Sequence, residues 1–447
     1  MDSLAKIAAA GVIGAGGAGF PTNVKLNTKA DYVLLNGAEC EPLLRVDQQL
    51  MKVHPDEVIS GLVTALRITG AQKAVIGIKE SHPDVIAVME DAVHRLENEG
   101  TVPADTVSVG TLPDIYPAGD EQVLVYELTG RIVPETAIPI AVGCVVINSE
   151  TAYNICRAQQ DIPVTEKYVT VTGCVPNPIT VKVPVGTPLS QLFELAGRAD
   201  LSGYAVINGG PMMGPLLTDA DKYVTKKTKG FVVLPKDHGL IRKKMRGMQQ
   251  AVHVNRSACE QCSMCTDLCP RHLLGHSTAP HKMVRAMAFG MPADEQTAAA
   301  LTCCQCNLCE YFSCPAGINP RMANAFYMGK LRADGIKVKP KESYKADPMR
   351  EYRKIPSKRL IQRLGLAAFN VPAPLNEDPG IKPAAAGIGL HDHVGAPASP
   401  MVSVGDHVTA GQLIAKLEDG KLGAAVHASI SGIVESADSN IILIRSE

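Results

Sequence analysis

Nine of the 13 cysteines in this 447-residue chain fall between positions 259 and 314. Eight of them form two runs that each end in Cys-Pro, the first spaced C-x2-C-x2-C-x3-C and the second C-x2-C-x2-C-x4-C. Thiolates at these spacings typically bind two cubane iron–sulfur clusters, and the fourth cysteine of each run binds the other cluster. The predicted ligands of the first cluster are Cys259, Cys262, Cys265 and Cys314, and those of the second are Cys303, Cys306, Cys309 and Cys269.

Two other interpretations of these cysteines fit the sequence less well. A zinc ribbon would need two C-x2-C pairs rather than two quartets, and disulfides are not expected in a chain that begins without a secretion signal. Cys304 fits neither run and is predicted to be buried without binding iron. The isolated cysteines are predicted core residues, because free cysteine is usually buried; they are Cys40, Cys144, Cys156 and Cys174.

A glycine-rich segment near the N-terminus is the second feature with chemical meaning. Residues 14–19 match G-x-G-x-x-G, and Glu39 follows at about the spacing of 20 residues that a dinucleotide-binding fingerprint requires. That fingerprint needs a preceding strand and a helix at its third glycine, whereas here an alanine-rich helix precedes the loop and Phe20-Pro21 follows it. Glycine N–H groups can still surround an anion, so the loop and Lys25 are predicted to bind a phosphate. A glycine turn without a ligand is the alternative.

Length and composition restrict the class of protein. A chain of 447 residues is too long for one core, so roughly three or four domains are expected. The net charge of -1 and the 4% aromatic content give no sign of nucleic-acid binding. The longest apolar run, residues 138–147, is too short for a transmembrane segment. We therefore expect a soluble, cytoplasmic protein, which also suits thiolate-bound clusters.

The hydrophobic patterns predict several domains in series. Residues 1–160 alternate strand and helix patterns, which favours an α/β layer. Residues 165–235 are typical of a small β-grasp unit, and residues 250–335 hold the cysteine runs. Residues 336–384 are rich in charge and proline and are predicted to be a linker. Residues 385–447 contain short strands separated by glycine turns.

Individual elements follow from the same patterns. Short apolar runs predict strands at residues 32–36, 74–78, 107–112 and 141–147, and helical spacing predicts helices at residues 56–68 and 83–96. Residues 224–235 are expected to form a strand pair, and residues 236–250 a basic helix.

Four motifs resemble the flavin region of the NADH-oxidising subunit of respiratory complex I. They are residues 14–22 with Lys25, residues 36–42, residues 116–121 and residues 148–151. The resemblance implies that FMN is bound by Gly14, Gly16, Lys25, Asn36, Glu39, Glu121, Asn148 and Thr151. It also implies that the catalytic residues facing the nicotinamide are Phe20 and Glu41. Ala15, Ala38 and Ile147 depart from the pattern of that subunit, so weaker FMN binding is expected.

Nearly the whole chain is similar to the RnfC-like family, and in particular to the cobalamin reductases of propanediol-utilisation microcompartments. Residues 47–51 and 265–273 carry this resemblance, together with a sandwich domain placed last rather than first. It implies a multidomain α/β protein with a Rossmann-like FMN/NADH domain, an SLBB β-grasp domain, an α-helical twin [4Fe-4S] ferredoxin domain and a barrel-sandwich hybrid. Lys421 is expected to be unmodified, and His391 and His393 are expected to be solvated rather than metal ligands.

The resemblance implies that electrons pass from NADH through FMN and two [4Fe-4S] clusters to cobalamin. A flavin can exchange two electrons or one, which suits a chain that also carries one-electron clusters. We expect the order FMN, first cluster, second cluster, acceptor. The implied partners are a corrinoid or corrinoid enzyme system and a shell or redox partner protein of a bacterial microcompartment. An RnfC-like electron-input subunit of a membrane ferredoxin:NAD oxidoreductase, or a cluster-bearing scaffold, are the alternatives.

Overall fold

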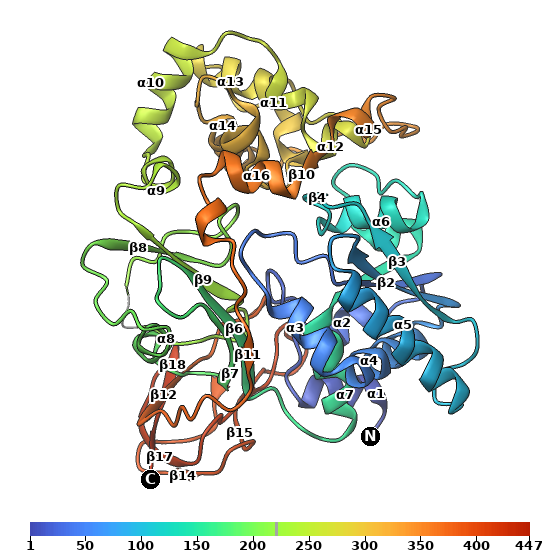
Figure 1. Ribbon diagram of the computed structural model, residues 1–447, viewed down its shortest axis with the longest axis vertical. Coiled ribbons are helices and arrows are strands. Elements are labelled where there is room, and N and C mark those ends of the chain that lie inside the picture. Colours follow the sequence, from blue (N-terminus) through green and yellow to red (C-terminus); the bar gives the residue numbers. More distant parts are fainter. Residues whose placement is uncertain (220–221) are drawn as a thin grey trace.

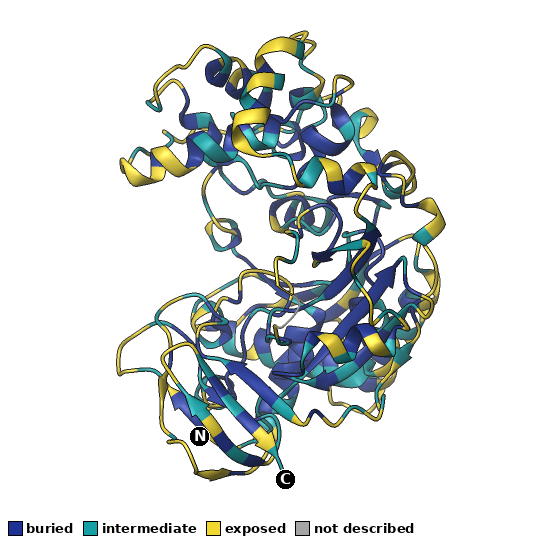
Figure 2. Cartoon of the chain, turned by 90° about the vertical axis from the view of Figure 1, so that its left-hand side faces the viewer, coloured by how far each residue is buried: buried dark blue, intermediate teal, exposed yellow. Residues whose placement is uncertain are grey.

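The computed structural model describes residues 1–219 and 222–447. Figure 1 shows the cysteine-rich helices at one end of the molecule and both chain termini toward the other, with the N-terminal α/β region and a second β region between them. Figure 2 shows that the strands are largely buried, whereas the outermost helices of the cysteine-rich end expose one face.

The N-terminal region is built on a parallel sheet with the strand order β3-β2-β1-β5. Its strands are β1 (Tyr32–Asn36), β2 (Lys73–Lys79), β3 (Val107–Leu112) and β5 (Cys144–Asn148). The chain moves outward from β1 to β3 and then returns to the other side of β1 as β5. Strand order therefore reverses between β1 and β5, and ligands of open α/β sheets bind at the carboxyl ends of the strands at such a point.

Helices cover both faces of this sheet, which is why its strands are almost continuously apolar. Along β1, Val33 and Leu35 pack into one core and Leu34 into another. The helices of this region are α1 (Ser3–Ala9), α2 (Thr22–Leu26), α3 (Val46–Val53), α4 (Pro55–Thr69), α5 (Pro83–Asn98), α6 (Glu121–Thr129) and α7 (Ser149–Gln159). A short strand, β4 (Ile115–Tyr116), precedes α6, and a 3-10 turn (Pro139–Val142) precedes β5.

The next region is a five-stranded sheet with the order β11-β7-β6-β9-β8. Its elements are β6 (Glu166–Gly173), β7 (Ile179–Pro184), α8 (Leu189–Leu195), β8 (Tyr204–Asn208) and β9 (Gly230–Pro235), with β11 added from later in the chain. The expected strand pair at residues 224–235 is wrong, because only β9 forms. Residues 225–228 make a turn in which the Thr225 N–H donates to Thr228 Oγ1 at 2.9 Å.

The cysteine-rich region is helical. The expected helix at residues 236–250 is interrupted at Gly247, whose extended backbone (φ -77°, ψ 167°) separates α9 from α10. The helices are α9 (Gly239–Lys244), α10 (Met248–Ala258), α11 (Met264–Asp267), α12 (Pro270–Leu273), α13 (Pro280–Ala288) and α14 (Pro320–Ala333), with a 3-10 turn (Ala298–Thr302) and a π-helical turn (Cys309–Ser313).

The segment predicted as a linker, residues 336–384, contains regular structure that joins the other regions. It includes α15 (Arg350–Arg353), β10 (Ile355–Pro356), α16 (Ser357–Arg363), a 3-10 turn (Ala367–Phe369) and β11 (Leu375–Asn376). β10 pairs with β4 and β11 pairs with β7. The segment is anchored because Ile355, Leu360 and Leu366 are buried in a core that also contains Tyr116 and Cys306.

The C-terminal region packs two small sheets, ordered β12-β18-β17-β14 and β13-β15-β16. The strands are β12 (Ala385–Gly389), β13 (Ser399–Pro400), β14 (His407–Val408), β15 (Leu413–Lys416), β16 (Val426–His427), β17 (Gly432–Ala437) and β18 (Ile441–Ser446). Lys421 is exposed and pairs with Glu418 at 2.6 Å. The solvated state expected for His393 is wrong: it is 5% exposed. Among the described residues, no helix combines the length and apolar character that a membrane span requires.

Candidate functional site

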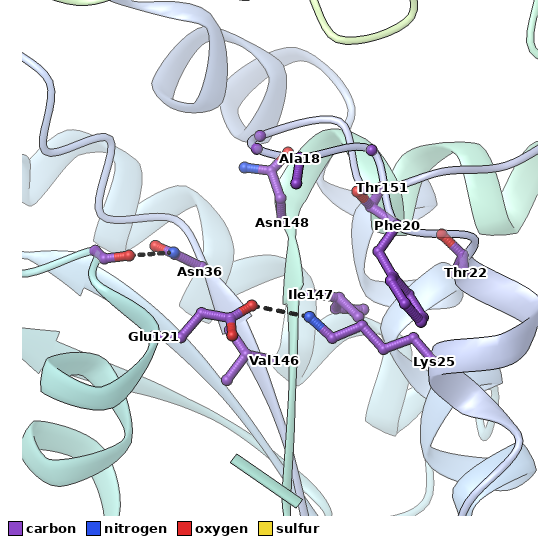
Figure 3. Close-up of a pocket in the computed structure, with 15 residues that line it drawn as sticks. Ala18, Phe20, Thr22, Lys25, Asn36, Glu121, Val146, Ile147, Asn148 and Thr151 are labelled. Atoms are coloured by element: carbon purple, nitrogen blue, oxygen red, sulfur yellow. Dashed lines mark hydrogen bonds and ion pairs between the residues drawn. The ribbon is translucent and has the colours of Figure 1, made fainter. Parts of the chain in front are cut away.

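A cavity of about 400 Å³ opens at the carboxyl ends of β1 and β5 (Figure 3). It contains every predicted flavin or catalytic residue except Glu39 and Glu41, namely Gly14, Gly16, Phe20, Lys25, Asn36, Glu121, Asn148 and Thr151. Further residues that were not predicted also line the cavity; they are Gly17, Ala18, Gly19, Thr22, Gly119, Val146 and Ile147. The sequence could have identified these residues, because nearly all lie inside or beside the four motifs that resemble the complex I flavin region.

The glycine loop leaves room for a ligand that side chains would fill. A Cβ atom on Gly16 would lie 3.1 Å from the Asn148 side chain, and Gly17 faces open space. The N-terminus of α7 points into the same cavity, since Asn148 caps it by accepting the Glu150 N–H at 3.1 Å. Backbone N–H groups at a helix N-terminus and a nearby lysine favour an anion, so the residues present fit a phosphate group.

Buried charges hold the cavity in place from behind. Asp47 Oδ1 accepts hydrogen bonds from Asn148 Nδ2 at 3.0 Å and from Lys229 Nζ at 2.6 Å, and also from the Ser149 hydroxyl. Lys167 forms an ion pair with Glu150, and each side chain is only 1% exposed. Asp47 therefore orients Asn148, while two lysines of the β-grasp region neutralise the acids beneath the loop. Buried charges require such pairing.

The front of the cavity is polar on one side and aromatic on the other. Lys25 Nζ contacts Glu121 Oε1 at 2.9 Å, and Asn36 Nδ2 donates to the Gly119 carbonyl at 2.9 Å (Figure 3). Phe20, which is 37% exposed, lies between this cavity and an adjoining one of about 410 Å³. The adjoining cavity is mostly apolar and is lined by Val24, Ile138, Ile140, Val145 and others.

Glu39 and Glu41 do not reach the glycine-loop cavity. Glu39 accepts the backbone N–H groups of Asp47 and Gln48 at 3.0 and 3.2 Å, at the start of α3. Glu41 accepts those of Met212 and Met213 at 2.9 and 2.8 Å, in a loop of the β-grasp region. Burial raises the pKa of both carboxyl groups, that of Glu39 to about 7. The two acids instead line a separate cavity of about 420 Å³.

The eight paired cysteines fall into two groups. Cys259, Cys262, Cys265 and Cys314 line one small cavity and are called the outer group. Cys269, Cys303, Cys306 and Cys309 interact electrostatically with one another and are called the inner group. The fourth cysteine of each run thus joins the first three of the other. Among the described residues, no three such side chains converge on a single metal position, and four thiolates around a multi-iron cluster need not do so.

The two runs fold alike where their spacings agree. Gln261 and Gln305 have left-handed backbones (φ 53° and 59°), and so do Ser263 and Asn307 (φ 61° and 63°). Each glutamine donates from Nε2 to the first cysteine of its run, at 3.1 and 3.2 Å. Such backbones are costly away from glycine, so their repetition in both runs indicates a functional constraint.

The extra residue of the second run is accommodated in a π-helical turn. Cys309–Ser313 is π-helical where the first run has the α-helical Met264–Asp267. A π turn takes in one more residue per turn and often marks a functional site. It therefore lets Cys314 reach the outer group despite the longer C-x4-C spacing.

The cysteines outside the two groups differ in exposure. Cys144 and Cys156 are buried as expected, whereas Cys40 and Cys174 are only partly buried. Cys304, also partly exposed, lies beside Cys306 in the inner group. Burial raises the pKa of Cys265 and Cys303 to about 12. Iron binds cysteine as the thiolate, so a positively charged centre would have to offset this effect of burial.

The inner group contacts the flavin region. Tyr116 Oη donates to the Cys306 carbonyl at 2.8 Å, and Arg271 Nη2 pairs with Asp120 Oδ2 at 2.8 Å. Residues 116–121 also supply Gly119 and Glu121 to the glycine-loop cavity. The group built on the second run is therefore the one adjacent to the cavity, and the order of electron transfer stays a prediction.

Comparison with known proteins agrees with this architecture. Family models match the Nuo51 FMN-binding domain at residues 7–157, the SLBB domain at 168–216, the 4Fe-4S dicluster domain at 258–319 and the RnfC barrel sandwich hybrid domain at 380–446. The chain is 44% identical to the cobalamin reductase PduS of Salmonella typhimurium, covering 98% of this chain and 95% of that protein. The PduS of Citrobacter freundii is 45% identical, covering 98% and 96%.

The chain belongs to the PduS family. The four domain matches confirm the predicted fold class and make it an oxidoreductase with an FMN-binding and a 4Fe-4S dicluster domain. A more distant relative is one component of the Na(+)-translocating ferredoxin:NAD(+) oxidoreductase complex of Acetobacterium woodii. It is 36% identical over 273 residues, which are 59% of this chain and 56% of that component.

Proposed function

We propose that this protein is an NADH-dependent cobalamin reductase that carries electrons from NADH through FMN and two [4Fe-4S] clusters to a corrinoid. The proposal rests on the position of residues 116–121. This segment helps to line the glycine-loop cavity and also contacts the inner cysteine group. A donor site and a one-electron site are thus separated by a single loop. Membership of the PduS family supports the corrinoid as acceptor.

In this proposal the glycine-loop cavity holds FMN. The loop N–H groups, the α7 N-terminus and Lys25 bind the phosphate, while Asn36, Asn148 and Thr151 orient the rest of the molecule. Thr151 already has a fixed position, since its Oγ1 accepts the Ala15 N–H at 3.0 Å. Bound flavin would supply the exchange between an electron pair and single electrons.

NADH is proposed to bind in the adjoining apolar cavity, on the far side of Phe20. Phe20 can pack against a planar nicotinamide, and Glu121 and Lys25 line both cavities and can meet its polar groups. Glu41 has no part in this site, because both of its carboxylate oxygens accept backbone N–H groups of the β-grasp loop.

The cysteines are proposed to hold two [4Fe-4S] clusters in the order inner, then outer. Cys269, Cys306 and Cys309 of the inner group are buried, whereas Cys262 of the outer group is exposed. The outer group is therefore the exit through which a corrinoid or a redox partner protein would receive electrons. We assign the protein to the cytoplasm, inside a bacterial microcompartment, with a shell or redox protein as partner.

The decisive experiment measures NADH-driven reduction of cob(III)alamin and cob(II)alamin by the protein reconstituted anaerobically with FMN, iron and sulfide. Rapid, NADH-dependent formation of reduced corrinoid is expected, together with about eight irons per chain. Failure to reduce corrinoid while ferredoxin is reduced would favour the second candidate, an RnfC-like electron-input subunit. That candidate is supported by the likeness to the Acetobacterium woodii protein and by the RnfC sandwich match.

A further inference from the structure

Arg271 occupies the boundary between the inner cysteine group and the flavin region. It lies in α12, two residues after Cys269, and its side chain is 12% exposed. Nη2 pairs with Asp120, which is equally buried, but Nε is buried and has no hydrogen-bond partner among the residues that the structure describes. An unpaired buried donor is costly, so it calls for a partner that completes the site.

Two cysteines in the segment of the second run lie close enough to the guanidinium to interact with its charge. Arg271 interacts with Cys304 and with Cys303. The backbone N–H groups of Arg271 and His272 point to the Cys269 sulfur. The positive charge of Arg271 therefore lies beside the cysteines of the second run, close to the inner group.

Asp120 connects this charge to the flavin region through its two oxygens. Oδ1 caps α6 by accepting the N–H groups of Gln122 and Val123, each at 3.2 Å, and Oδ2 pairs with Arg271. The neighbouring residues Gly119 and Glu121 line the glycine-loop cavity. One carboxylate thus fixes Arg271 relative to both sites.

We propose that Arg271 sets the reduction potential of the inner cluster, by donating a hydrogen bond from Nε to a cluster or cysteine sulfur and by placing a positive charge beside it. The inference rests on the proposed function, because it presupposes a cluster in the inner group. Hydrogen bonds to sulfur, net charge and solvent exposure are the features that determine cluster potentials. Arg271 raises the potential of the inner cluster, which favours electron transfer from the flavin, and Asp120 limits that increase.

A positive charge near the outer group would have little effect on the reduction potential there. Arg256, in the last turn of α10 before Cys259, is exposed, so solvent and salt screen it. Arg271 is largely buried, and in a buried site the effective dielectric constant is lower and charge interactions are stronger. This contrast provides a matched control.

The test is a redox titration of the reconstituted protein, with each cluster followed by electron paramagnetic resonance. Arg271→Gln is expected to shift the inner midpoint to a more negative potential, and Arg271→Lys to shift it less. Asp120→Asn is expected to shift it in the opposite direction, because it removes the negative charge that faces Arg271, while its single amide oxygen can still cap α6. Arg256→Gln is expected to leave the inner midpoint unchanged.

The outcomes separate this inference from the proposed function. Absence of an inner-cluster signal in the wild-type protein would contradict the proposed function itself. A wild-type signal whose midpoint is unchanged in Arg271→Gln, or that shifts in the same direction in Arg271→Gln and Asp120→Asn, would overturn the role of Arg271. If Arg271→Gln does not retain the cluster, Arg271→Lys and Asp120→Asn decide: opposite shifts support the role, and unchanged midpoints overturn it.

Discussion

The inner and outer cysteine groups come from runs of nearly identical spacing, yet they lie in different surroundings. Cys269, Cys306 and Cys309 are no more than 8% exposed, whereas Cys262 is exposed. The inner group shares a core with Tyr116 and Ile355, which come from other regions, and the core beside the outer group is formed by cysteine-region residues. Neighbouring domains thus give a repeated ligand motif two different surroundings, which the proposed function uses as a relay and an exit.

The largest expected effect comes from removing one cysteine of each group. Cys306→Ala and Cys262→Ala should each lower the iron content from about eight to about four per chain. Both should abolish cobalamin reduction. Only Cys306→Ala should also stop electrons from reaching the remaining cluster, because the inner group lies between it and the flavin.

The measurement is stopped-flow absorbance after mixing with NADH, with iron analysis and a dye that accepts electrons at the flavin as control. Dye reduction should persist in both variants. Rapid reduction of the outer cluster in Cys306→Ala would contradict the inner-to-outer order.

The next largest effect is a loss of flavin binding that leaves both clusters in place. Gly16→Val places methyl groups where a Cβ alone would already lie 3.1 Å from Asn148. Flavin affinity should fall at least about tenfold, a loss of about 1.4 kcal/mol. Cluster absorbance should remain, since Gly16 is remote from both groups. Fluorescence of released flavin checks the prediction, and full flavin occupancy in the variant would rule out the loop as the phosphate site.

A smaller effect concerns the anchoring of the inner group. Tyr116→Phe removes the donor to the Cys306 carbonyl and leaves that carbonyl unpaired in a buried position. Stability should fall by about 1–3 kcal/mol, the usual cost of an unsatisfied buried polar group. Denaturant unfolding followed by cluster absorbance measures the change. Tyr352→Phe is the control, because Tyr352 is 83% exposed; equal losses in the two variants would show that the hydrogen bond does not anchor the group.

The smallest effect is a pH dependence of stability that comes from Glu39, outside both cysteine groups. Burial, followed by the charge of Asp47, raises the pKa of Glu39 from 4.5 to about 7. Because the folded state holds this proton more tightly, the stabilisation is full below pH 4.5 and is lost as the pH rises through about 7.

Denaturant unfolding at several pH values should therefore give a weaker pH dependence between about 4.5 and 7 for Glu39→Gln than for the wild type. Glu90→Gln, on the exposed part of α5, should keep the wild-type dependence. Identical pH profiles for Glu39→Gln and the wild type would contradict the prediction.

The sequence predicted the parts of the site that depend on local geometry. Cysteine spacing indicated which side chains gather, and Cys314 indeed lines a cavity with Cys259, Cys262 and Cys265. The glycine loop and the motif around Asn148 lie in one cavity because both follow from a parallel sheet whose strand order reverses. Such features are carried by a few neighbouring residues, so their spacing in the chain is sufficient evidence.

Only the tertiary structure decided how these parts meet. Glu41, expected beside the nicotinamide, instead accepts N–H groups from Met212 and Met213. The predicted linker adds strands to two sheets, and the contacts of Tyr116 and Arg271 join the inner group to the flavin region. These contacts join residues more than 100 positions apart, and they depend on shape and burial at domain boundaries. Local sequence patterns determine which residues can bind a cofactor, but long-range packing determines which sites become neighbours.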